Sequence, residues 1–137
     1  RMSEAVDSGF SISAVGQLLF VRRWGVLSRA QGREFAQQYL TICKPLQAGP
    51  WAEVIDLREA IGVEQGHADE VAVLFQQASL QANLATAYII SERTAAQHLL
   101  DLQQLIATQT ASFADEFFDN PIDALNWVNQ RLAAAAS

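Results

Sequence analysis

Two charged residues at the end of an apolar segment are the first candidates for chemistry. Asp56 and Arg58 close the segment of residues 50–58, which opens at the turn signal Gly49-Pro50 and is otherwise almost continuously apolar. Short apolar runs of this kind are typical of strands buried on both faces of a parallel sheet. In open α/β sheets, ligands and partners gather at the carboxyl ends of such strands. The sequence therefore places Asp56 and Arg58 where a functional site is expected.

The spacing of Asp56 and Arg58 allows two interpretations. Side chains two positions apart in a strand point to the same face, so these two are able to pair. The simpler interpretation is a salt bridge or capping interaction that closes the strand end. The alternative is a catalytic pair.

The two histidines add little further chemistry. His67 stands near an expected loop–helix junction with Glu64 and Asp69 close by, which suits a metal ligand or a catalytic base but is more commonly a solvated helix start. His98 is expected on the polar side of its helix. Two histidines this far apart and a single cysteine do not form a zinc-binding spacing. We therefore predict no metal site.

Motifs of common reaction types are also missing from the sequence. Gly62 and Gly66 do not follow a strand in the pattern of a phosphate-binding loop, and no serine stands between two glycines as a nucleophile elbow. The sequence predicts a protein that is not an enzyme and needs no cofactor. An enzyme in which Asp56, Arg58 and His67 converge is a weaker hypothesis than the two binding functions described below.

Composition excludes several classes of protein. The formal net charge is −6, and the only clustered cations are Arg22-Arg23, so nucleic acid is not an expected partner. Cys43 is the only cysteine, and it falls on the apolar face of an expected helix as a core residue. No apolar run reaches the roughly 18–20 residues of a membrane span, and no signal peptide is recognised. We expect a cytoplasmic protein.

One surface has the composition of a membrane contact. Trp24 ends an expected strand at residues 18–24, where Arg22 and Arg23 are expected to emerge into solvent. An amphipathic ring beside basic side chains suits the membrane–water interface. Ordinary packing at the sheet edge explains the same residues equally well. A peripheral contact with the inner membrane is therefore one of two readings.

The pattern of apolar residues predicts an α/β fold with the order β-β-α-β-α-β-α-β-α. Residues 10–14 and 18–24 form an antiparallel hairpin, Ser28 and Gln31 form a capping box, and Pro45 with Gly49-Pro50 ends the first helix. Strands at 86–90 and 112–118 and a helix from Asn120-Pro121 follow. This order predicts a mixed sheet of about five strands with helices packed on it. We expect a flexible arm at 1–8, one domain at 9–132 and a frayed tail at 133–137.

These elements together resemble a known superfamily. The residues that carry the resemblance are the strand at 18–24 with its Ser-capped helix, the segment Pro50-Trp51-Ala52-Glu53-Val54-Ile55-Asp56-Leu57-Arg58, and the ending Phe117-Phe118-Asp119-Asn120-Pro121-Ile122-Asp123-Ala124-Leu125-Asn126-Trp127. They resemble the SpoIIAA-like/STAS superfamily, and more narrowly the small stand-alone bacterial domains that share this fold with CRAL-TRIO lipid-transfer domains. The resemblance covers residues 10–132.

One departure narrows the function that this resemblance implies. Anti-sigma-factor antagonists of the superfamily carry a phosphorylated serine after the central strand, whereas no serine or threonine lies between Asp56 and Ser79 here. The resemblance then implies a non-catalytic module that binds a small apolar, lipid-like ligand. The alternative is a regulatory domain that docks on another protein without phosphorylation. A homodimer through an exposed strand edge is left open.

The ligand pocket is expected between the helical layer and the sheet, near residues 56–66. Its expected lining is apolar and consists of Leu57, Ile61, Val63, Val71 and Phe75.

Overall fold

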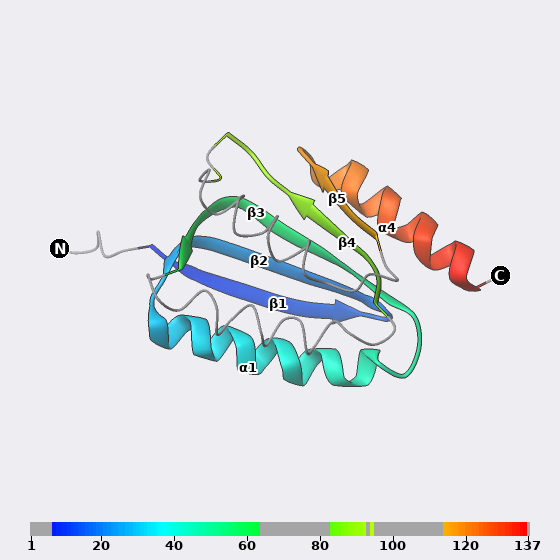
Figure 1. The fold of residues 1–137 in the computed structure, drawn as a ribbon, viewed down its shortest axis with the longest axis horizontal. Coiled ribbons are helices and arrows are strands. Elements are labelled where there is room, and N and C mark those ends of the chain that lie inside the picture. The colour runs from blue at the N-terminus through cyan, green and yellow to red at the C-terminus, as the bar shows by residue number, and fades with distance from the viewer. Residues whose placement is uncertain (1–6, 64–82, 93, 95–113, 137) are drawn as a thin grey trace.

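The computed structural model describes residues 7–63, 83–92, 94 and 114–136, and these form a mixed α/β sheet with two helices. The elements are β1 (Gly9–Val15), β2 (Leu18–Leu27), α1 (Arg29–Leu46), β3 (Trp51–Val63), β4 (Asn83–Ile89), β5 (Ala114–Phe118) and α4 (Pro121–Ala136). The strands lie side by side in the order β1-β2-β3-β4-β5 (Figure 1). β1 is antiparallel to β2 and all other neighbours are parallel, which confirms the expected mixed five-stranded sheet. The helices expected between β3 and β4 and between β4 and β5 lie outside the described residues.

The hairpin and the first helix follow from local sequence signals. Gly16 adopts a positive φ of 60°, which lets the chain reverse between Val15 and Leu18. The capping box at the start of α1 is confirmed, because the Gln31 amide donates to Ser28 Oγ and the Ser28 amide donates to Gln31 Oε1. As the sequence predicted, this helix ends between Pro45 and Gly49. α1 continues to Leu46, since a proline this close to the end removes little of the hydrogen-bond ladder.

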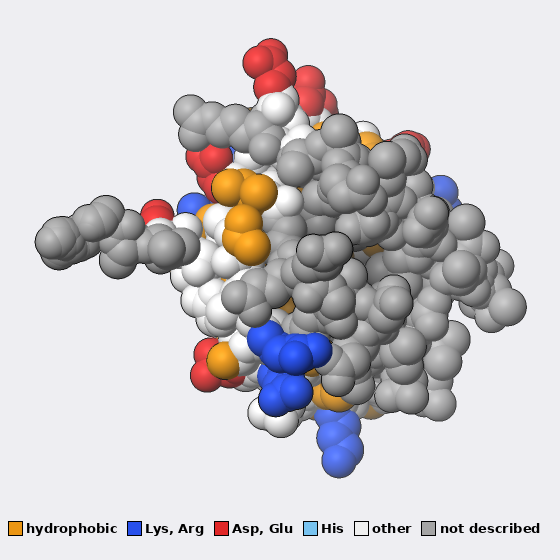
Figure 2. Space-filling view, turned by 60° about the vertical axis from the view of Figure 1, so that its left-hand side comes forward, with side chains coloured by type: hydrophobic (Ala, Val, Ile, Leu, Met, Phe, Trp, Pro, Cys, Tyr) orange, Lys and Arg blue, Asp and Glu red, His pale blue; other side chains and the backbone are white. Residues whose placement is uncertain are grey.

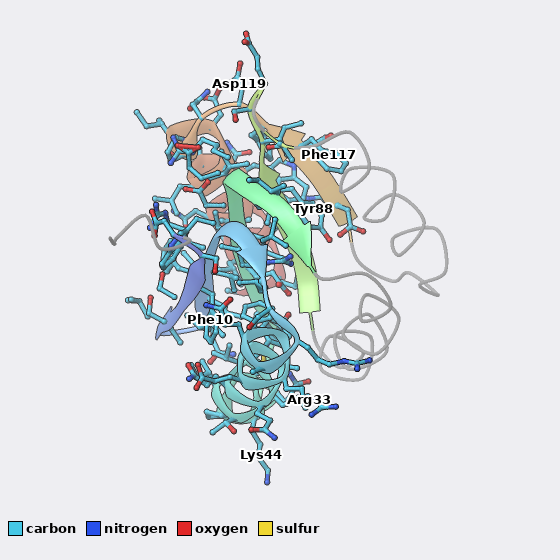
Figure 3. The ribbon with its side chains drawn as sticks, turned by 90° about the vertical axis from the view of Figure 1, so that its left-hand side faces the viewer. Phe10, Arg33, Lys44, Tyr88, Phe117 and Asp119 are labelled. Atoms are coloured by element: carbon cyan, nitrogen blue, oxygen red, sulfur yellow. The ribbon has the colours of Figure 1, made fainter. Side chains whose placement is uncertain are left out.

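The two helices cover opposite faces of the sheet. Side chains of α1 pack against Leu19 and Val21 of β2 and against Trp51, whose side chain is completely buried. Side chains of α4 pack against Ala52 and Val54, the positions of β3 that alternate with Trp51. Figure 3 shows α1 and α4 on the two sides of the strands. The sheet is therefore the middle of three layers, as its apolar central strand requires.

β3 is longer than the sequence indicated. The expected strand ended at Arg58, but β3 continues to Val63 and pairs with β2, which itself continues to Leu27. Register shifts occur after Arg22 and after Gly25, so the two strands bend together beyond this point. Glycines in this part weaken the strand signal in the sequence, and the ladder between β2 and β3 compensates for them.

Candidate functional site

The carboxyl ends of the parallel strands surround a polar hollow, which we call the edge hollow. Its volume is about 790 Å³. The residues that line it come from β2, β3 and the ends of β4 and β5: Arg22, Asp56, Arg58, Glu59, Ile90, Ser91, Glu92 and Asp119. Figure 2 shows acidic side chains gathered at the top of the molecule, the end at which Asp119 is labelled in Figure 3. This is the edge of an α/β sheet at which ligands are expected.

Asp56 and Arg58 form an ion pair inside the edge hollow. The Arg58 guanidinium donates from Nη2 to Asp56 Oδ2 at 2.7 Å and from Nε to Asp56 Oδ1 at 3.0 Å. The Arg58 amide donates to the same Oδ1 at 3.1 Å. Burial raises the pKa of Asp56, but the hydrogen bonds and charge of Arg58, together with the charge of Arg22, outweigh it and lower the pKa below its ordinary value. The same contact raises the pKa of Arg58.

Hydrogen bonds from the chain after β4 hold β3 just past its last pair with β4, which is Asp56 with Ile89. Ser91 Oγ donates to the Arg58 carbonyl at 2.8 Å, and Thr94 Oγ1 donates to the Leu57 carbonyl at 2.9 Å. Thr94 Oγ1 also accepts from the Ser91 amide at 3.1 Å. Two hydroxyls therefore hold the backbone carbonyls of Leu57 and Arg58, and Arg58 is positioned by its backbone as well as by Asp56.

The chain after β5 closes the hollow on the other side. The Ile90 amide donates to the Phe118 carbonyl at 2.9 Å, which keeps β4 and β5 paired at their ends. Asn120 then begins α4, as the sequence predicted, because its Oδ1 accepts from the Asp123 amide at 2.9 Å. Asn120 Nδ2 donates to Asp119 Oδ1, also at 2.9 Å. The cap of α4 thus orients Asp119, a carboxylate of the hollow.

Arg22 forms the wall of the edge hollow on the β2 side, and Trp24 lies next to it. The Arg22 guanidinium carbon lies 4.5 Å from the centre of the Trp24 ring, a cation–π contact. Trp24 Nε1 donates to Asp7 Oδ1 at 3.1 Å. Both residues also line a flanking hollow of about 560 Å³ with Glu59 and Ile61. Arg22 is therefore held in place at a junction of two hollows.

Arg23 does not share this wall. The sequence suggested that Arg23 emerges into solvent beside Arg22, but its side chain is only 6% exposed. The alternation of the strand turns it to the α1 face, where its guanidinium lies 5.5 Å from the centre of the Phe35 ring. Burial lowers the pKa of Arg23 to about 10. Of the three residues expected to form a membrane contact, only Arg22 and Trp24 lie together at the surface.

An apolar groove adjoins the edge hollow on the α4 face of the sheet. Its volume is about 230 Å³. The apolar groove is lined by Ser11, Ser13, Phe20, Val21, Arg22, Val54, Asp56, Ile89, Pro121 and Leu125. Arg22 and Asp56 belong to both the groove and the hollow. The apolar groove and the charged edge hollow therefore meet at these two side chains.

On the α1 face of the sheet, β3 carries a buried carboxylate, Glu53, which lines none of the hollows described above. Glu53 is 2% exposed, and Tyr39 Oη donates to its carboxylate, 2.8 Å from each oxygen. Burial and the charge of Glu53 raise the pKa of Tyr39 well above its ordinary value. Burial also raises the pKa of the Cys43 thiol to about 12, which agrees with the core position expected from the sequence.

The described members of the expected ligand lining do not lie together in one pocket. Leu57 is completely buried and packs with Ala60 and Tyr88, whereas Ile61 is 54% exposed and lines the flanking hollow. Val63 is the last residue of β3. Val71 and Phe75 lie outside the described residues, so the set as a whole stays a prediction.

The remaining candidates for metal binding or catalysis are only partly among the described residues. His67 lies outside the described residues, so its convergence with Asp56 and Arg58 stays untested. Among the described residues, no group of three histidine, cysteine or carboxylate side chains is placed to hold a metal ion. Neither α1 nor α4 is long and apolar enough to span a membrane.

Sequence reasoning missed Ser91, Thr94 and Asp119, although a signal was present. Ser91 and Asp119 directly follow the apolar segments that became β4 and β5. Parallel strands end at the same edge of a sheet, so the polar residues that follow each of them are expected to meet there. Applied to all strands, the rule that singled out Asp56 also finds Ser91 and Asp119.

Comparisons with known proteins bear on the fold. No model of a protein family and no curated protein matches this sequence. A solved structure does match: an uncharacterised protein of the DUF3478 family from Shewanella loihica PV-4, described as having a SpoIIAA-like fold. The TM-score is 0.68 at 17% sequence identity, and the match covers 93% of this chain and 99% of that chain. The chain therefore has a SpoIIAA-like fold, as its resemblance to that superfamily implied.

Proposed function

We propose that this protein is a non-catalytic binding module whose ligand is a small lipid-like molecule. Its apolar chain would occupy the apolar groove between β2, β3 and α4, and its polar head would lie in the edge hollow. The observation that carries this proposal is that the two spaces lie side by side and share Arg22 and Asp56 in their lining. Ligand sites typically combine an apolar lining with a few placed polar groups.

The charges at the junction favour a head group with a single negative charge. Arg58 is engaged by Asp56, whereas the Arg22 guanidinium stacks on Trp24 and forms no ion pair within the described residues. Arg22 is therefore the cation that would bind an anionic head. Glu59, Glu92 and Asp119 line the same hollow and would repel a second negative charge. A fatty-acid-like carboxylate meets these conditions.

The properties of Asp56 support a binding role more than a catalytic one. A general base at neutral pH works best with a pKa near 7, but the pKa of Asp56 lies below its ordinary carboxylate value. Its two oxygens already accept hydrogen bonds from Arg58. The pair is suited to shaping the hollow and keeping its local charge balanced.

The same end of the molecule is suited to loading from a membrane surface. Ile61 and Val26 are exposed apolar side chains on the extended ends of β3 and β2. Ile61 and Trp24 line the flanking hollow together with Arg22. Exposed apolar and aromatic side chains beside a cation are the features of a peripheral membrane contact.

The first experiment is native mass spectrometry of the purified protein, followed by solvent extraction and titration with decanoate. We expect either co-purified lipid or saturable binding of decanoate. Arg22→Gln removes the cation at the head and should weaken decanoate binding about 10- to 100-fold. Arg33→Gln, an exposed arginine on α1 (Figure 3), is the matched control and should bind like wild type.

A second pair of variants tests the chain site. Ser13→Trp places a large ring over the apolar groove and should abolish binding, whereas Val15→Trp, on the same strand but outside the groove, should leave it unchanged. A ligand-free mass together with no binding to decanoate or to lipid vesicles would reject the proposal. The regulatory docking domain would then become the leading hypothesis.

A further inference from the structure

The sequence of β1 lacks the features that usually prevent an edge strand from pairing with a strand of another molecule. β1 is the first strand of the sheet order, so one side of its backbone has no strand partner in the described sheet. Its sequence, GFSISAV, contains no charged residue and no proline, and its register with β2 runs without a shift. Natural edge strands are usually protected by charges, prolines or bulges. An unprotected edge of seven residues is a site for pairing with another strand.

We propose that the partner is a second copy of this chain, paired antiparallel through β1 about a two-fold axis. Two five-stranded sheets would then join into one continuous sheet. Such an interface is isologous, because the same strand contributes from both copies. This inference does not require the proposed ligand, although Ser11 and Ser13 also line the apolar groove.

The sequence of β1 is complementary to itself in one register. A two-fold axis at Ile12, the middle residue of the strand, places Ser11 opposite the partner's Ser13. The same register places Phe10 opposite the partner's Ala14, a large side chain beside a small one. Opposed serines form favourable cross-strand pairs, and no like charges meet. This self-complementarity favours a second copy over an unrelated peptide.

Within the described residues, no strand lies along the outer edge of β1. α1 packs on the face of β1 that carries Phe10 and Ile12, so it covers a face of this strand and leaves the other face to Ser11 and Ser13. Ser11, Ser13 and Val15 are exposed on the α4 face, and Val15 is 69% exposed. Pairing would cover part of this strand, and the partner's Ser11 and Ser13 would continue the wall of the apolar groove.

Analytical ultracentrifugation of the full chain tests the proposal. Wild type should sediment as a species of twice the chain mass of 15.0 kDa. Ser11→Lys with Ser13→Lys places like charges directly opposite each other twice, and should raise the dissociation constant at least about ten-fold. Gln37→Lys with Gln38→Lys adds the same charge on the exposed side of α1 and should have no effect.

A crosslinking experiment tests the register itself. Opposed residues in an antiparallel pair place their Cβ atoms about 4.5–5.5 Å apart, within reach of a disulfide, whereas residues two positions out of register are farther apart. A mixture of Ser11→Cys and Ser13→Cys chains should crosslink on oxidation, and each variant alone should crosslink far less. Cys43 is buried and should not interfere.

Three results would overturn the proposal. The first is a wild-type monomer at every concentration. The second is a dimer that the two lysines leave intact. The third is a dimer in which the mixed cysteine variants crosslink no better than each one alone.

Discussion

Glu53 is a carboxylate held almost completely out of water on the α1 face of the sheet. Tyr39→Phe removes a hydroxyl that donates to both of its oxygens at 2.8 Å. We expect the free energy of unfolding to fall by about 1–3 kcal/mol, because a buried charge loses a donor. Urea denaturation measures this loss.

Tyr88→Phe is the matched control for that experiment. The Tyr88 side chain is also buried, but its hydroxyl forms no hydrogen bond within the described part of the chain. Its loss should cost clearly less. Equal losses for the two tyrosines would show that the Glu53 contact contributes nothing specific.

Asp115 makes stability depend on pH. Its Oδ1 is buried without a hydrogen-bond partner, and burial raises the pKa of this carboxyl from 3.8 to about 6. The folded chain therefore binds this proton more tightly than the unfolded chain, so the contribution of Asp115 is fully present below pH 3.8 and is lost as the pH rises towards 6. Asp115→Asn should flatten this decline and add about 1 kcal/mol at pH 7, a value reduced for partial solvent exposure. Denaturation midpoints from pH 4 to 7 test this, and parallel profiles for the two proteins would contradict it.

For single residues, the sequence predicted contacts between residues at a fixed spacing in one strand. It did not predict which strand residues are buried by a helix from another part of the chain. The period of a strand was enough to place Asp56 and Arg58 on one face, where they pair. The same period separates Arg22 from Arg23, but the sequence did not reveal that Phe35 covers Arg23. Which face of a strand is covered is decided by a helix elsewhere in the chain.

Between elements, Thr94 is the main link from the chain after β4 to β3. Thr94→Val keeps the shape of the side chain but removes the hydrogen bonds to the Leu57 carbonyl and from the Ser91 amide. We expect a loss of about 1–3 kcal/mol, with faster hydrogen exchange near the ends of β3 and β4. Thr41→Val, at an exposed position of α1, should change stability by less than about 0.5 kcal/mol. Unchanged exchange in the Thr94 variant would contradict the link.

The bend in β2 depends on Gly25. This residue has a φ of 70°, and a Cβ placed there would lie 2.9 Å from Ser8 Cα. Gly16 also has a positive φ but faces open space. Gly16→Ala should cost about 1 kcal/mol from its conformation, and Gly25→Ala should cost clearly more because backbone atoms must also move. Thermal unfolding of the two variants separates these effects, and equal shifts would rule out the steric contribution.

Helix starts were predictable from the sequence, whereas the ends of β2 and β3 were not. Ser28 with Gln31 and Asn120 with Pro121 are local signals, and both helices begin where these signals place them. The end of β3 has no local signal, because its last residues are held by pairing with β2. The length of a strand depends on its pairing with a neighbouring strand. The sequence of one segment alone therefore underestimates the length.

For the whole molecule, the alternation of apolar segments was sufficient to predict a mixed sheet of about five strands, and the structure confirms it. The expected ligand lining stays a prediction, because Val71 and Phe75 lie outside the described residues. Within the described part, Leu57 packs in a small cluster with Ala60 and Tyr88. The apolar groove of the proposed ligand lies on the other face of β3, with Val54 and Ile89, beneath α4. Adjacent residues of β3 point to opposite faces, so the sequence of a strand buried on both faces does not show which face binds a ligand.

The two edges of the sheet differ in charge, and this difference sets a limit on growth. β1 is neutral, whereas β5 begins with Ala114-Asp115-Glu116. A dimer joined through β1 therefore presents only acidic β5 strands at its two ends, which repel further copies. We expect the sedimenting mass to level off at two chains as concentration rises, and Glu116→Thr to permit larger species. The sheet therefore has one edge that can pair and one edge that repels. We expect its assembly to stop at a dimer and not to extend into a fibre.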